Sequence, residues 1–183
     1  MIINIRESVF ETNSSSCHAI VVKKDSRIAK RFPPYINHDG KLYIGSYKLQ
    51  FGRAPFEVLC GVYDKARYAY AVSQYYPNEN MTDVIEEVLK EEYPEVKEIS
   101  FNSSYSDDKE PDLGYIDHQS TDLLMSFIRD HNITLKDFLK DDRYVILIDG
   151  DEYDTIHDLM NTGLFNTDNI AEIVNAFGSK ETF

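Results

Sequence analysis

A short N-terminal segment gathers the residue types that RNA cleavage without a metal ion requires. Residues 6–18 read Arg-Glu-Ser-Val-Phe-Glu-Thr-Asn-Ser-Ser-Ser-Cys-His. Attack by an RNA 2′-hydroxyl on the adjacent phosphate needs a base, an acid and a cation beside the phosphate. His18 with Glu7 or Glu11 supplies the proton-transfer groups, and Arg6 supplies the positive charge. These four are the candidate catalytic residues.

The same segment is rich in short side chains that donate hydrogen bonds to phosphate oxygens. Two lysines at the end of the next apolar run begin a stretch with five basic residues in nine. A structural interpretation stands beside this one, because Ser, Thr and Asn also satisfy the backbone of a hairpin loop and His18 is then an ordinary strand residue. Spacing alone leaves both open. The candidate RNA-binding residues are Asn13, Ser14, Ser15, Ser16, Lys23 and Lys24.

Charge is divided unevenly along the chain. Residues 1–76 carry 11 Lys and Arg against 6 Asp and Glu, whereas residues 77–183 carry 8 against 26. This asymmetry predicts a charged partner, such as a nucleic acid or a protein that binds one. An acidic block in the second part either mimics a phosphate backbone or is a solvated surface. The block contains Glu86, Glu87, Glu91, Glu92, Glu95, Asp107, Asp108, Glu110 and Asp112.

The sequence offers no clear metal or cofactor site. Cys17 and Cys60 are far apart, no two histidines have a ligand spacing, and no Gly-rich phosphate loop is present. Residues 149–154, Asp-Gly-Asp-Glu-Tyr-Asp, lack the spacing of a calcium loop and favour a hairpin turn. We therefore expect no cofactor.

No apolar run reaches the length of a membrane span, and we expect a cytoplasmic protein that does not enter a membrane.

The pattern of apolar residues and turn signals predicts the elements that position the candidate site. It indicates an α+β fold, with a mainly antiparallel sheet, helices packed on a face and an N-terminal β-hairpin. We expect a single domain over 1–183, with the hairpin of about residues 1–24 as a functional appendage. Expected strands are Ile2–Ile5 paired with Ala19–Lys23, Lys41–Ile44 paired with Tyr47–Phe51, Val96–Phe101 and Arg143–Ile148. Expected helices are Pro55–Gln74, Met81–Tyr93, Thr121–His131, Thr134–Leu139, Thr155–Asn161 and Asp168–Phe177.

Aromatic side chains are numerous, with 13 Tyr and 10 Phe. Most should lie in the core. Tyr68, Tyr70, Tyr75 and Tyr76 follow one another closely near Arg67, and such rings either stack on bases or are half-buried packing residues.

The segment Val9-Phe-Glu-Thr-Asn-Ser-Ser-Ser-Cys-His18 is similar to the Phe-Glu-Thr-Asn-Ser-Ser-Ser-x-His opening of a group of small phage and mobile-element proteins. The whole chain resembles a type II-A anti-CRISPR protein. That resemblance implies inhibition of the RNA-guided nuclease of type II systems through truncation of its single guide RNA, with the nuclease required and the N-terminal hairpin important. It leaves open whether the protein cuts RNA itself, as a metal-independent endoribonuclease, or redirects the nuclease.

A second function hypothesis requires no catalysis. The protein is then an acidic decoy, whose residues 77–112 occupy a nucleic-acid channel of the nuclease and block guide or DNA binding. In that case the N-terminal hairpin is structural.

Overall fold

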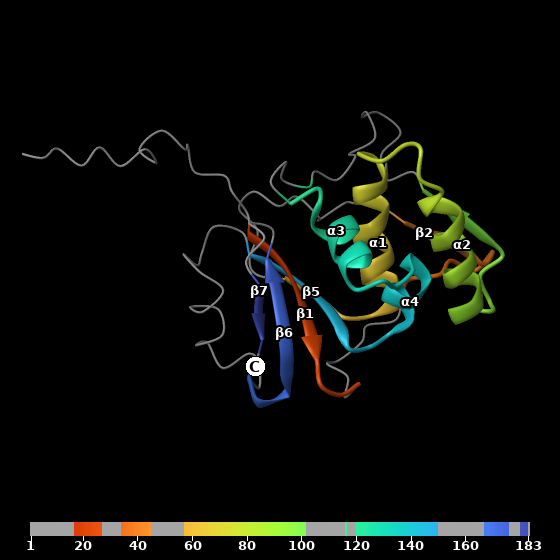
Figure 1. The fold of residues 1–183 in the computed structure, drawn as a ribbon. Helices are drawn as coiled ribbons and strands as arrows, with labels where there is room; N and C mark the ends of the chain where they lie inside the picture. The colour runs from red at the N-terminus through yellow and green to blue at the C-terminus, as the bar shows by residue number, and fades with distance from the viewer. Residues whose placement is uncertain are drawn as a thin grey trace, which may run out of the picture.

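In the part of the chain that the structure describes, a five-stranded sheet forms one layer and four helices form the other (Figure 1). The computed structural model describes residues 17–26, 34–44, 57–101, 116, 120–149, 167–175 and 180–182. The strand order in the sheet is β3-β5-β1-β6-β7, and every neighbouring pair is antiparallel. The α+β class with a mainly antiparallel sheet is therefore confirmed. The strands are β1 (Cys17–Lys23), β3 (Glu57–Leu59), β5 (Tyr144–Asp149), β6 (Ile170–Asn175) and β7 (Lys180–Thr182).

Strand β1 lies in the middle of this sheet. Its residue Ala19 pairs with Leu147 of β5 on one side and with Asn175 of β6 on the other. Both faces of the strand are buried, as its uninterrupted apolar pattern predicts. Over Ala19–Val22, β5 pairs with one edge of β1 and β6 pairs with the other, so no further strand can pair with β1 there. The expected partner Ile2–Ile5 lies outside the described residues, and the N-terminal hairpin stays a prediction.

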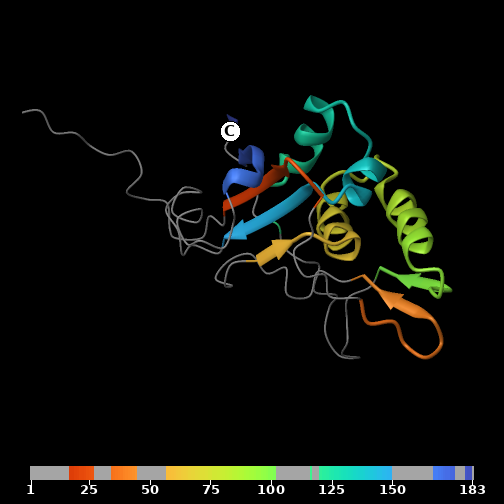
Figure 2. The same ribbon diagram turned by 90° about the horizontal axis from the view of Figure 1, so that it is seen from below.

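The helices lie on one side of the sheet (Figures 1 and 2). Ile20, Ile146 and Ile148 pack with helical residues in the larger core cluster. Ala19, Val21 and Leu147 point to the other face and belong to a separate cluster, in which no residue of the four helices takes part. The helices are α1 (Val62–Ser73), α2 (Met81–Glu92), α3 (Leu123–Asp130) and α4 (Leu135–Lys140).

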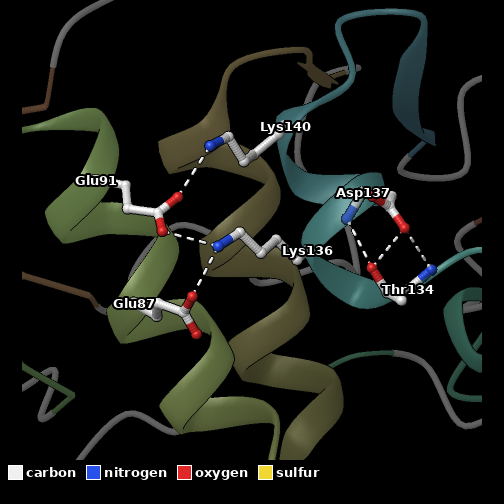
Figure 3. A network of polar contacts seen from close by, with 6 residues as sticks. All are labelled: Glu87, Glu91, Thr134, Lys136, Asp137 and Lys140. Atoms are coloured by element: carbon white, nitrogen blue, oxygen red, sulfur yellow. Dashed lines mark hydrogen bonds and ion pairs between the residues drawn. The ribbon is translucent and has the colours of Figure 1, made fainter.

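Helices α2 and α4 confirm the sequence pattern closely. The inward residues of α2 are Ile85, Val88 and Leu89, each fully buried. Thr134 caps α4: its hydroxyl accepts a hydrogen bond from the Asp137 backbone N–H at 3.1 Å, and the Asp137 carboxylate accepts one from the Thr134 N–H at 3.0 Å (Figure 3). This reciprocal capping box satisfies two backbone donors that the first turn leaves without intrahelical acceptors.

The helix expected over Pro55–Gln74 begins later than predicted. Residues Glu57–Leu59 form β3, which pairs with Ile146–Ile148 of β5, and α1 starts only after Gly61. A three-residue strand is too short to show its own period. Leu59 at the end of the strand and Cys60 just after it are buried, and their spacing from the apolar residues of α1 also fits a helix. The sequence pattern therefore extended the predicted helix across β3.

The helix expected over Asp168–Phe177 is wrong, because Ile170–Asn175 is β6. The pairing of β1 with β6 shifts register between Val22 and Lys23, where Val22 opposes Glu172 and Lys23 opposes Ile170. This bulge inserts one extra residue, so Ile170 and Ile173 both join the same buried cluster although they are three apart. A three-residue apolar spacing imitates a helix, and the bulge that causes it cannot be read from the sequence.

A second, two-stranded sheet lies apart from the main one. Strand β2 (Lys41–Tyr43) runs parallel to β4 (Glu98–Ser100). The expected partner Tyr47–Phe51 lies outside the described residues, and that pairing stays a prediction. The predicted turn before β2 is present, with the Gly40 N–H donating to the Asn37 carbonyl at 2.9 Å. Gly40 has a φ of +82°, which favours glycine. Its carbonyl accepts the N–H groups of Lys97 and Glu98, which joins the turn to β4.

Candidate functional site

The candidate site residues that the structure describes lie at two ends of β1. His18 is near the start of the strand, and Lys23 and Lys24 are at its finish. Lys24 follows His18 by six residue steps along nearly extended backbone, which corresponds to roughly 20 Å. The structure therefore does not bring these residues together at one phosphate. The other candidates, Arg6, Glu7, Glu11, Asn13, Ser14, Ser15 and Ser16, lie outside the described residues.

His18 is fully buried on the helical side of the sheet. It pairs with Ile148 across β1 and β5, and its ring lies 5.7 Å from the ring of Tyr68 on α1. The Nδ1 atom of His18 is 3.1 Å from the Tyr68 hydroxyl oxygen. Both side chains have 0 % exposure. The end of the polar N-terminal motif is thus held inside the core.

Burial decides the charge of this pair. Removal from water lowers the pKa of His18 to about 3, because the imidazolium loses its hydration. The same cause raises the pKa of Tyr68. Both groups are consequently neutral at physiological pH. In this conformation the imidazole neither touches solvent nor takes up a proton near pH 7, so proton transfer to RNA by His18 requires an opening of the N-terminal part of β1.

The two lysines at the far end of β1 donate hydrogen bonds to backbone carbonyls just before β5 and β6. The ammonium of Lys24 donates to the backbone carbonyl of Asp168 at 3.1 Å, and its N–H donates to the carbonyl of Asn169 at 2.8 Å. The N–H of Lys23 donates to the Arg143 carbonyl at 2.9 Å. Lys24 is exposed, so its charge is also available to a ligand.

The acidic block is partly neutralised by the protein's own lysines (Figure 3). The Lys136 ammonium on α4 lies 2.7 Å from the Glu87 carboxylate and 2.8 Å from that of Glu91 on α2. Lys140 approaches Glu91 at 2.9 Å. Hydrogen bonds from these lysines lower the pKa of Glu91 to about 2, so the Glu91 carboxylate stays charged down to acidic pH. Glu86 pairs with Lys90 one helical turn further along α2.

Lys65 is a buried polar residue that the sequence-based prediction missed. Lys65 of α1 has 0 % exposure, and its ammonium donates to the backbone carbonyls of Phe138 at 2.9 Å and Asp141 at 2.8 Å. These carbonyls are at the end of α4, where intrahelical donors run out and the helix dipole attracts a cation. A signal was available, because Lys65 falls beside Val62, Ala66 and Ala69 on the apolar face of α1.

A second polar contact joins α3 to the sheet. His131 stacks on Phe127 with ring centroids 3.9 Å apart. Its Nδ1 lies 2.9 Å from the Phe127 carbonyl oxygen and its Nε2 lies 3.1 Å from the Glu172 carboxylate on β6. His131 and Glu172 are 41 residues apart in the sequence, so no local sequence pattern predicts this contact.

Comparisons with known proteins identify no relative: no family model, curated protein or solved structure matches the chain. Within the described residues, no three or more His, Cys, Asp and Glu side chains gather in a group that could hold a metal ion. None of the described helices is long and apolar enough to cross a membrane.

Proposed function

We propose that this protein is an anti-CRISPR protein that inactivates the RNA-guided nuclease of a type II system by bringing about truncation of its single guide RNA. The observation that carries the proposal is the motif Val9–His18 and the resemblance that rests on it. The partners are then the effector nuclease and its guide, and the site of action is the cytoplasm of a bacterial host cell.

The buried position of His18 supports a functional role for the motif Val9–His18, because it anchors one end of the motif. The motif enters the central strand of the sheet, and its last residue is fixed by Tyr68 in the core. A polar segment that acts on a ligand needs a rigid point of attachment, because catalytic groups must be held close to their productive geometry. In this proposal His18 acts first as a positioning residue, and its proton-transfer role applies only where the strand opens.

The cleavage step uses the chain's own groups. A carboxylate, Glu7 or Glu11, or an exposed His18 takes the proton from the 2′-hydroxyl, and the 2′-oxygen bonds to phosphorus. The bond from phosphorus to the 5′-oxygen breaks, and that oxygen receives a proton from the second group. Arg6 stabilises the negative charge that grows on the phosphate. The products are a 2′,3′-cyclic phosphate and a 5′-hydroxyl.

The ion pairs of the acidic block favour this function over the decoy. Mimicry of nucleic acid needs carboxylates that a basic channel can pair with, whereas Glu86, Glu87 and Glu91 already have lysine partners within this protein. The acidic surface is therefore better suited to attract the basic nuclease at long range than to replace its nucleic acid.

The test incubates nuclease, guide and protein and sizes the RNA on a denaturing gel. We expect truncation only when the nuclease is present, because a balance of +5 over residues 1–76 is too small to hold free RNA tightly at physiological salt. Efficient cutting of naked guide would contradict the nuclease requirement, and an intact guide would overturn the proposal.

Two further arms identify the catalyst. A nuclease whose own catalytic residues have been inactivated should still support truncation if this protein cuts. Cleavage should also survive EDTA once the nuclease–guide complex is shown to remain intact, and should leave a 2′,3′-cyclic phosphate or its hydrolysis product. Loss of truncation with the inactive nuclease would mean that the protein redirects its target.

A further inference from the structure

The structure changes which tyrosines are available to a partner. Tyr68 and Tyr70, which the sequence places among stacking candidates, are buried, with exposures of 0 % and 8 %. Among the described residues, three large apolar or aromatic side chains are exposed: Tyr35 at 72 %, Tyr43 at 38 % and Tyr75 at 44 %. Two of these three, Tyr43 of β2 and Tyr35 just before the turn that leads into it, lie near each other.

Tyr35 and Tyr43 occupy the same surface. Ile36 forms an antiparallel bridge with Leu42, so the residues one step away, Tyr35 and Tyr43, lie opposite each other. Leu42 is fully buried, and because strand residues alternate in direction, Tyr43 faces outward. Figure 2 shows β2 and β4 at the lower right, away from β1 and β5 of the main sheet.

Cations lie over the ring of Tyr43 and over that of Tyr63, which contacts Tyr43. The Lys41 ammonium lies 5.5 Å from the centre of the Tyr43 ring, and a hydrogen bond from Lys41 to Glu98 raises the Lys41 pKa. On α1, the Arg67 guanidinium lies 5.8 Å from the Tyr63 ring, and the Tyr63 hydroxyl donates to the Tyr43 carbonyl at 2.9 Å. Tyrosine rings interleaved with Lys and Arg are typical of proteins that stack the bases of single-stranded nucleic acid.

The small exposed aromatic area favours one class of partner over another. Tyr35 and Tyr43 together expose about one tyrosine's worth of surface, on the order of 200 Å². A specific protein interface needs about 800 Å² on each side. Base stacking needs only one ring for each base, and it adds roughly 1–3 kcal/mol per base. A short single strand therefore fits this surface better than a protein does.

We propose that Tyr35, Lys41 and Tyr43 form a stacking surface, the tyrosine face, for two neighbouring bases of single-stranded RNA. Lys41 has a partner in Glu98, which is 64 % exposed, and the lysine can exchange that carboxylate for a phosphate. As a contact for the guide RNA the tyrosine face rests on the proposed function, whereas its affinity for single-stranded RNA does not.

The experiment measures fluorescence anisotropy of labelled oligouridine with the full chain at low salt, without nuclease. Tyr43→Ala and Tyr35→Ala should each weaken binding by about fivefold to a hundredfold, and Tyr43→Phe should leave it nearly unchanged. The Tyr63 hydrogen bond goes to the backbone of Tyr43, so substitution of the ring leaves that contact possible. Circular dichroism checks that each variant is folded.

Tyr75→Ala is the matched control. Tyr75 is similarly exposed but follows the opposite end of α1, twelve residues from Tyr63 and roughly 18 Å along the helix axis. It should retain wild-type binding. A photoreactive uridine should crosslink to a peptide that contains Tyr35 or Tyr43.

Several results would overturn the tyrosine face: no oligouridine binding by the wild type, wild-type binding by folded Tyr35→Ala and Tyr43→Ala, or equal loss in Tyr75→Ala. Loss of nuclease association in Tyr43→Ala with unchanged RNA binding would assign the surface to a protein contact and would also overturn it. Intact guide in the truncation assay, beside tyrosine-dependent oligouridine binding, would overturn only the proposed function.

Discussion

The Nδ1 atom of His18 lies 3.1 Å from the hydroxyl oxygen of Tyr68, and neither side chain is exposed to solvent. This contact joins the middle strand of the sheet to α1, fifty residues later in the chain. The histidine that the sequence offers as a candidate for proton transfer is therefore a core residue by its environment. Stability and activity measurements on this pair separate the two roles.

The first prediction concerns the pH dependence of stability. The unfolded chain protonates His18 below pH about 6.5, whereas the folded chain holds its pKa at about 3. Between these values the unfolded state binds more protons, so the free energy of unfolding falls as the pH is lowered, by up to about 1.4 kcal/mol per pH unit from this group. Above pH about 6.5 this contribution is fully present. Urea denaturation at a series of pH values measures it.

The window from pH 6.5 to 4.5 is the informative one, because lowered carboxylate pKa values, such as that of Glu91, add their own dependence at lower pH. His18→Gln cannot take up this proton and should show a flatter profile across the window. An unchanged slope in a folded His18→Gln variant would contradict the assignment.

The second prediction concerns Lys65. Lys65→Met keeps most of the side-chain volume but leaves the carbonyls of Phe138 and Asp141 without the ammonium donor. We expect a loss of about 2 kcal/mol or more in the free energy of unfolding, the scale for unsatisfied buried acceptors. The control is Lys136→Met, which removes two ion pairs at the surface and should change stability far less. Equal effects of the two variants in urea denaturation would contradict a capping role for Lys65.

The sequence predicted the elements whose apolar residues repeat with a single period, because each of those elements has one buried face and one exposed face. Helix α2 has a polar face and an apolar face, and α4 begins with a capping box that can be read from Thr134 and Asp137. Strand β6 could not be predicted, because its bulge gives Ile170 and Ile173 a helical spacing. The direction of His18 could not be predicted either, since both alternating sets of β1 are apolar and the choice depends on Tyr68, which is distant in sequence.

The third prediction separates the roles of Arg6, His18 and Tyr68 in guide truncation. Arg6→Ala should slow truncation about 100-fold, the usual scale for loss of a charge-stabilising group. If His18 positions the motif, Tyr68→Phe should slow truncation about as much as His18→Gln, and both losses should follow the loss of stability. If His18 carries the proton, His18→Gln should slow truncation about 100-fold while Tyr68→Phe retains most activity. Rates are measured from the guide fragments on a denaturing gel.

The last prediction concerns the acidic block and distinguishes the decoy hypothesis from the truncation mechanism. Replacing Glu86, Glu87, Glu91 and Glu92 by Gln together should weaken association with the nuclease, because the long-range attraction falls when four negative charges are removed. The lysines that pair with three of these residues, Lys90, Lys136 and Lys140, are then released and add to the repulsion.

The cut position should be unaltered in whatever complex still forms, because the four substituted glutamates lie on α2 and not in the N-terminal motif. Association is measured by surface plasmon resonance at several salt concentrations, and the difference between the variant and the wild type should shrink as salt is added. A control with Lys136→Gln alone should bind the nuclease at least as well as the wild type. Complete loss of inhibition in the glutamate variant, with normal inhibition by Arg6→Ala, would favour the decoy and exclude the truncation mechanism.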